Sequence, residues 1–162
     1  MRKVGLLIAA VSLVACAKTE SAKTDTAAPA AAAAPAAPAA PAAVTAADMV
    51  GTVNGKVMME KSDSVLFTFT CTTAQGATIS RCVNSMAPKD TTDYTYTLSG
   101  ADSVTWVSAA YTPAAPPKAP KQIDHVTGHL AANKWTGTVV SMLASKPDSV
   151  VARTRWEGTK TQ

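Results

Sequence analysis

The chain has 162 residues, and its 15 basic and 11 acidic side chains give a formal net charge of +4. Basic and acidic residues are interspersed along the chain and no basic run occurs, whereas a nucleic-acid-binding protein needs a clustered positive face. We therefore expect no nucleic-acid partner, and the length suits one small folded domain with flanking segments.

The first segment is basic and then apolar. Arg2 and Lys3 precede a run from Val4 to Val14 that only Gly5 and Ser12 interrupt. Eleven helical residues rise about 16 Å, whereas a bilayer core is about 30 Å thick. A basic start with a short apolar core describes a secretory signal peptide. We therefore predict a signal peptide over residues 1–15.

The segment Leu13-Val14-Ala15-Cys16 ends this run. It resembles the lipobox of bacterial lipoproteins, although an ordinary signal peptide with a chance cysteine is the alternative. The resemblance implies a diacylglycerol on the Cys16 sulfur and an acyl chain such as palmitate on its amine, and two or more chains anchor a protein stably. Ala17 replaces the aspartate that often marks inner-membrane retention. This implies a lipid anchor in the bacterial envelope, at the outer membrane and facing the periplasm.

A linker over residues 16–47 is expected next. Residues 27–43 read AAPAAAAAPAAPAAPAA, and such closely spaced prolines prevent a continuous helix. The stretch has no large apolar group to pack, so we predict a disordered, partly polyproline tether rather than a helical stalk.

Two cysteines remain if Cys16 carries lipid. Cys71 and Cys82 flank Gln75-Gly76-Ala77-Thr78, where a glycine suits a hairpin turn. A hairpin centred between Gly76 and Ala77 places the cysteines opposite each other. A two-residue loop would make them a hydrogen-bonded pair, and a four-residue loop, which we favour, would make them the closer, non-hydrogen-bonded kind. We predict a structural disulfide, since a redox-active pair lacks the CxxC spacing.

Residues 48–162 are expected to form one all-β domain. Threonine, valine and aromatic residues alternate between turn clusters, and no long stretch has helical periodicity. Eight strands are predicted, over residues 49–59, 65–73, 78–84, 94–99, 103–112, 122–131, 134–144 and 149–159. Short connections favour an eight-stranded antiparallel up-and-down barrel, because closure removes exposed sheet edges. A β-sandwich is the alternative.

Two short motifs resemble lipocalin-like barrels. That family begins with a glycine-x-tryptophan strand and ends with an arginine-bearing strand that packs near it. This chain has Gly51-Thr52-Val53 early and "VARTRWEG" late, with Arg153 or Arg155 as the arginine. The resemblance implies a barrel that surrounds one small apolar ligand.

Six aromatic side chains are predicted to point inward, as a filled core or as the wall of an apolar pocket. An eight-stranded barrel admits either arrangement. If a pocket exists, Gly51, Gly55, Gly128 and Gly137 would leave space in its wall. The loop over residues 111–122 contains four prolines and is read as a connector, a lid or a docking segment. The six aromatic residues are Phe67, Phe69, Tyr94, Tyr96, Trp106 and Trp135.

No catalytic constellation, cofactor motif or metal site is predicted. His125 and His129 would lie about 13 Å apart on a strand, too far for one metal ion. We expect a non-enzymatic, envelope-anchored lipoprotein whose barrel is a structural or protein-interaction module. A lipocalin-like carrier or sensor of a small apolar ligand is the alternative, and an undetected hydrolase is a third.

Overall fold

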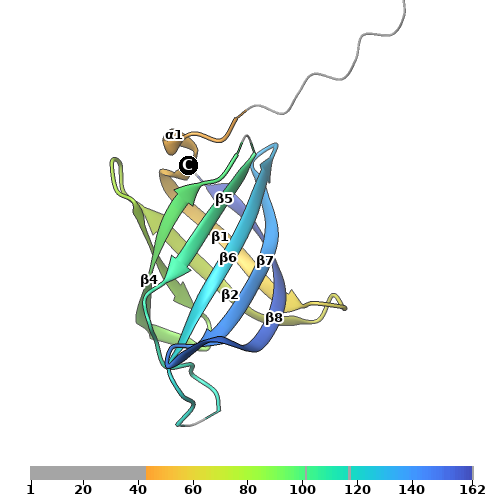
Figure 1. Cartoon of the computed structure of the whole chain (residues 1–162). Helices are drawn as coiled ribbons and strands as arrows, with labels where there is room; N and C mark the ends of the chain where they lie inside the picture. Colours follow the sequence, from red (N-terminus) through yellow and green to blue (C-terminus); the bar gives the residue numbers. More distant parts are fainter. Residues whose placement is uncertain (1–42, 101, 117, 162) are drawn as a thin grey trace, which may run out of the picture. The chain divides into compact units, whose positions relative to one another are not determined.

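The computed structural model describes residues 43–100, 102–116 and 118–161, which form a barrel (Figure 1). Cys16, the predicted signal peptide and most of the predicted linker lie outside the described residues. The barrel begins with the short helix α1 (Ala46–Met49). The strands follow as β1 (Gly51–Met59), β2 (Val65–Thr73), β3 (Ile79–Asn84), β4 (Ala87–Leu98), β5 (Ser103–Ser108), β6 (Gln122–Ala131), β7 (Lys134–Leu143) and β8 (Lys146–Thr161).

The eight strands form a closed antiparallel up-and-down barrel. Each strand pairs with its neighbour in chain order, and β1 pairs with β8 from Thr52↔Thr161 to Met59↔Thr154. Closure satisfies the backbone groups that an open sheet leaves unpaired at its edges. The predicted barrel is therefore confirmed, and the alternative of a β-sandwich is wrong.

The folded unit starts before Asp48, where the sequence placed the boundary between linker and domain. Val44 is buried, and Met49 belongs to α1 rather than to the first strand. The Thr45 N–H and hydroxyl both donate to Asp48 Oδ2, at 2.8 and 2.7 Å. In the described part of the chain, no helix has the length and apolar character that a bilayer crossing requires.

Two strands are longer than the sequence predicted. β4 begins at Ala87, seven residues before the expected Tyr94, and β8 begins at Lys146. Both extra segments are polar and contain a proline, so local propensity opposes a strand there. Pairing with neighbouring strands overrides that preference, as the Asn84↔Ala87 and Leu143↔Lys146 pairs show.

Two hairpins follow their predicted turns. Ala132 and Asn133 form a two-residue loop between β6 and β7, and both have the positive φ that a type I′ turn requires. The β2–β3 hairpin is centred between Gly76 and Ala77, because Thr73 pairs with Ser80. It thereby places Cys71 opposite Cys82.

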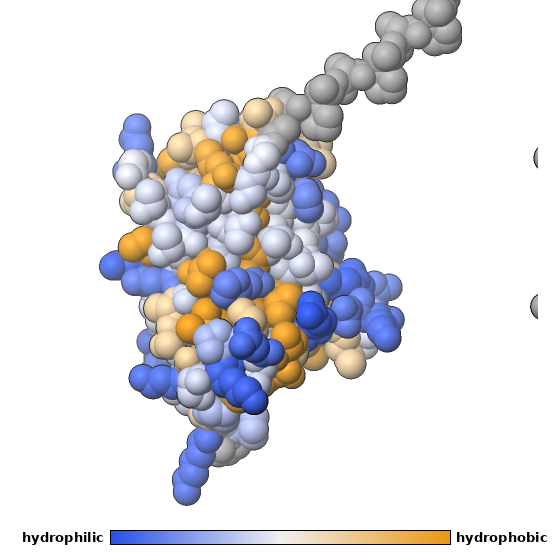
Figure 2. Space-filling view, viewed as in Figure 1, coloured by the Kyte–Doolittle hydropathy of each residue, from blue (hydrophilic) through white to orange (hydrophobic). Residues whose placement is uncertain are grey.

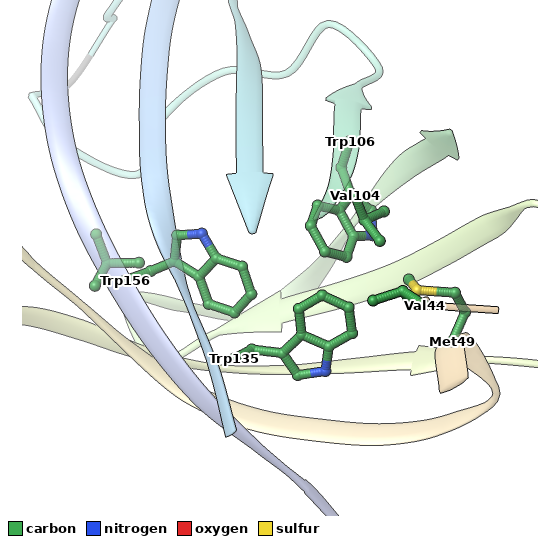
Figure 3. Packing of buried hydrophobic residues seen from close by; sticks show 7 residues of the cluster. Val44, Met49, Val104, Trp106, Trp135 and Trp156 are labelled. Carbon is green, nitrogen blue, oxygen red and sulfur yellow. The ribbon is translucent and has the colours of Figure 1, made fainter. Parts of the chain in front are cut away.

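One part of the barrel interior is densely filled. A tryptophan cluster comprises Val44, Met49, Val104, Trp106, Trp135 and Trp156 (Figure 3). Trp106 packs edge-on against both other indoles, with ring centroids 5.4 Å from Trp135 and 5.8 Å from Trp156. Val104 and Trp135 are only 0% and 1% exposed, so this cluster is the best-buried part of the core.

Glycines make room for these rings. A Cβ at Gly128 would lie 2.7 Å from Trp156 and 2.8 Å from Trp106, and one at Gly137 would lie 2.7 Å from Trp156. The space beside Gly55 is taken by Phe69. The predicted wall space at these glycines is therefore occupied by aromatic rings and adds no room for a guest.

Candidate functional site

The barrel contains a cavity of about 300 Å³. Side chains from all eight strands line it, together with α1 and the loop between β5 and β6. This volume is at the lower end of the range for small-molecule pockets. The interior is thus partly filled and partly hollow, where the sequence left the two arrangements as alternatives.

The cavity wall is mainly apolar and aromatic. Of the six aromatic residues predicted to point inward, five line the cavity; Trp156 lines it too. The sixth, Tyr96, packs against the core cluster instead, and its hydroxyl donates to the Ala77 carbonyl at 3.0 Å. The five are Phe67, Phe69, Tyr94, Trp106 and Trp135.

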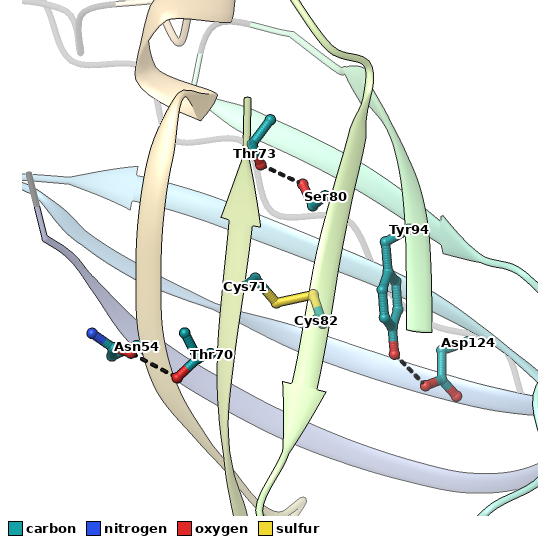
Figure 4. Close-up of a disulfide and its surroundings, with 8 residues drawn as sticks. All are labelled: Asn54, Thr70, Cys71, Thr73, Ser80, Cys82, Tyr94 and Asp124. Carbon is teal, nitrogen blue, oxygen red and sulfur yellow. Dashed lines mark hydrogen bonds between the residues drawn. A yellow bond between two sulfur atoms is a disulfide. The ribbon is translucent and has the colours of Figure 1, made fainter. Parts of the chain in front are cut away.

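The predicted disulfide is present and forms part of the same wall. Cys71 and Cys82 are directly opposite each other on β2 and β3, with Cα atoms 4.0 Å apart (Figure 4). Ser80 also faces inward on β3, which is an unfavourable position for an unpaired hydroxyl. The Ser80 and Thr73 hydroxyl oxygens are 2.7 Å apart and hydrogen-bonded, so this polar pair is satisfied inside the barrel.

A polar group, the Asp124 cluster, stands at the end of the barrel away from α1. Asp124 is 5% exposed and lines the cavity from β6. Its Oδ2 accepts hydrogen bonds from the Tyr94 hydroxyl at 3.0 Å, as Figure 4 shows, and from the Tyr111 hydroxyl at 2.8 Å. Its Oδ1 accepts from the Ser141 hydroxyl at 2.6 Å. The Asp124 N–H donates to Ser108 Oγ at 2.8 Å, which fixes the backbone beside the carboxyl group.

The two tyrosines are held in their neutral, donating form. Burial raises the pKa of Tyr94 well above its ordinary value, and the nearby Asp124 carboxylate raises it further. The same two causes raise the pKa of Tyr111. Both hydroxyl groups therefore remain hydrogen-bond donors to Asp124 throughout the physiological pH range.

The proline-containing loop between β5 and β6 also contributes to this region. Tyr111 makes two backbone hydrogen bonds with Gln122, at 3.0 and 2.8 Å, so the loop begins and ends at one bridge. Pro113, Ala114 and Ala115 line the cavity. The loop thus contributes one hydroxyl and several apolar side chains to the site.

One buried donor in the cavity wall has no partner. Trp135 Nε1 has no hydrogen-bond acceptor among the described residues, whereas Trp156 Nε1 donates to the Thr127 carbonyl at 2.9 Å. Leaving a buried N–H unpaired costs about 1–3 kcal/mol.

The two histidines lie elsewhere. His125 and His129 are exposed on β6, on the opposite face of the strand from Asp124. His129 Nδ1 lies 3.6 Å from Asp102 Oδ2. No group of three or more potential metal ligands occurs in the described ranges.

Asp124, Tyr111 and Ser141 were not identified from the sequence. Asp124 belongs to a strand whose other inward positions include Val126 and Gly128, and a lone aspartate in such a strand resembles a surface residue. Its partners are 13 to 30 residues away in the chain. The alternation of Gln122, Asp124 and Val126 on one face of β6 was the available indication.

The residues of the lipocalin-like motifs are placed as follows. Val53 lines the cavity from β1. Arg155 pairs with Met58, near the end of β1 that is far from Gly51, and its side chain bonds Asp63 and the Ser62 carbonyl. Arg153 is exposed. The resemblance to lipocalins therefore stays a prediction beyond the shared barrel architecture.

Comparisons with known proteins add no relative. A scan against protein-family models gives no match, and searches of curated proteins and of solved structures find no significant similarity.

Proposed function

We propose that this protein is an envelope-anchored lipoprotein whose barrel binds a small, mainly apolar molecule. The observation that carries this proposal is the cavity of about 300 Å³. Its aromatic wall would bury the body of a guest, and burial of apolar surface contributes about 25 cal/mol per Å². A few polar groups at one end would orient that guest, as in many small-molecule sites.

The arrangement suits binding rather than chemistry. Asp124 is engaged by three hydroxyl groups, and neither histidine reaches the cavity. A nucleophile, a base and an orienting group would have to converge for hydrolysis, and no such set lines the cavity among the described residues. The lipid at Cys16 and the linker would hold this binding domain at a membrane.

A cavity-filling substitution tests the proposal. The strands pair all the way around within residues 51–161, so the segment Ala17–Gln162 is suitable for work without acyl groups or detergent. Val126 lines the cavity, and Val126→Trp would occupy it with an indole. We expect this variant to bind the neutral probe N-phenyl-1-naphthylamine at least about tenfold more weakly, measured by fluorescence titration.

The matched control is His125→Trp, on the outer face of the same strand. It should bind the probe as the parent protein does. A folded Val126→Trp protein with unchanged affinity would contradict the proposal. So would absence of probe binding together with native mass spectra that show no retained small molecule.

A protein-interaction module is the second candidate. Apolar side chains are exposed near the strand ends away from α1, and on the face in Figure 2 most of the orange lies in that half. Exposed apolar groups of this kind favour a protein partner. A photo-cross-linking residue at Val150 should then capture one envelope protein that the same residue at exposed Thr136 does not. The exposed apolar residues near these strand ends are Met59, Val65, Leu66, Met86, Val150 and Val151.

A further inference from the structure

The charge of the cavity wall restricts what the barrel accepts. No Lys, Arg or His is among the described residues that line the cavity, whereas Asp48 and Asp124 both line it. An anionic guest would therefore meet carboxylates without a compensating cation. The interior favours a neutral or positively charged molecule.

Asp124 is the stronger of the two attractions. It is 5% exposed, and its partners are the hydroxyl groups of Tyr94, Tyr111 and Ser141. These hydrogen bonds solvate the carboxylate but do not neutralise its charge. A carboxylate has about four acceptor positions, and two donors on Oδ2 with one on Oδ1 leave a position open on Oδ1.

The aromatic wall supplies a surface for the apolar body of such a guest. Tyr94 is both a donor to Asp124 and part of the wall, and Trp106 and Trp156 line the same cavity. Burial of the apolar body of a guest against these rings would add to the attraction at Asp124. An apolar body with a positive end would thus be favoured at both of its parts.

We propose that the guest is an amphipathic organic amine, with its protonated nitrogen at Asp124 and its apolar body against the tryptophan rings. This inference rests on the proposed binding function and specifies the chemistry of its ligand. Buried charges in proteins are costly unless they are paired. An ammonium group would pair with the Asp124 carboxylate and donate to its open Oδ1 position.

Three probes of the same shape test this inference on the segment Ala17–Gln162. They are the cation 2-(1-naphthyl)ethylamine, the corresponding neutral alcohol, and the anion of 1-naphthaleneacetic acid (the acetate). Each is titrated by calorimetry at pH 7. We expect the amine to bind at least about tenfold more tightly than the alcohol, and the acetate more weakly than either. In Asp124→Asn the affinity for the amine should fall to that for the alcohol, while the affinity for the alcohol should not change.

Two further variants locate the effect. Asp148→Asn makes the same charge change at an exposed position and should leave the preference for the amine intact. Asp48→Asn removes the other acid of the cavity, at the α1 end, and should keep most of the preference for the amine, a result that stands even if Asp124→Asn fails to fold. Loss of the preference in Asp48→Asn would overturn the assignment to Asp124.

The outcomes separate this inference from the function on which it rests. If amine and alcohol bind equally well, the barrel is a binding protein but the amine specificity is wrong. If a folded Asp124→Asn keeps the preference, the carboxylate is not its source. If none of the three probes nor N-phenyl-1-naphthylamine binds, both proposals are overturned.

Discussion

The tryptophan cluster and the Asp124 cluster line the same cavity but are stabilised in opposite ways. The first is apolar, and its rings pack at centroid distances of 5.4 to 6.5 Å with glycines beside them. The second is polar, and three hydroxyl groups converge on one carboxylate. Close packing fills space, whereas a hydrogen-bonded network needs only correct distances and leaves neighbouring volume open. The contrast explains how so small a barrel has both a rigid core and a hollow.

The largest expected effect comes from breaking the packed region. Trp106 touches both other indoles, so Trp106→Ala would leave a cavity that the barrel cannot refill. We expect a loss of about 3–5 kcal/mol in the free energy of unfolding, measured by urea denaturation. Val107→Ala, at a neighbouring position 37% exposed, is the control and should cost far less. A loss below about 1 kcal/mol for Trp106→Ala would contradict the assignment of stability to this cluster.

Of the two clusters, only the polar one should respond directly to alkaline pH. Because the pKa of Tyr94 and that of Tyr111 are raised in the folded protein, their contribution is complete below the unfolded value of 10.0 and is lost as the pH rises above it. Above that value, each tyrosine should lower the free energy of unfolding by about 1.4 kcal/mol per pH unit. Absorbance at 295 nm should show both ionising only as the protein unfolds. Ionisation of both well before unfolding would contradict the burial of the Asp124 cluster.

A smaller effect on stability should distinguish a hydrogen bond to a charged acceptor from a hydrogen bond to a neutral one. Tyr111→Phe removes a donor to the Asp124 carboxylate and should cost about 1.5 kcal/mol. Tyr96→Phe removes a donor to the neutral Ala77 carbonyl and should cost about 1 kcal/mol or less. Thermal or urea unfolding of both variants measures the difference. Equal costs would mean that the Asp124 carboxylate gains little from its third donor.

The sequence was sufficient for the barrel and for much of its aromatic wall. Alternation with period two identified most strands, and the turn around Gly76 placed Cys71 opposite Cys82. The start of β4 was missed because residues 87–93 are too polar to show an inward face. The aromatic residues were found because their size makes inward positions recognisable.

The Asp124 cluster was beyond sequence reasoning for a physical reason. Its members come from three strands and a loop, and nothing local links Tyr94, Tyr111, Asp124 and Ser141. Only barrel closure brings them within hydrogen-bond distance. The partition between filled and hollow volume likewise depends on how the rings beside Gly128 and Gly137 pack in three dimensions.

The pairing of β1 with β8 has a consequence for biogenesis. The first and last strands of the barrel are neighbours, so their contacts join residues about 100 positions apart. A chain emerging from a ribosome or a translocation channel cannot finish this barrel until its final strand has been released. Such distant pairing slows folding. Until β8 pairs with β1, the unfinished barrel exposes the unpaired backbone groups of two edge strands. A holding chaperone at the exit site would therefore raise the yield of this protein more than that of a helical domain of equal size.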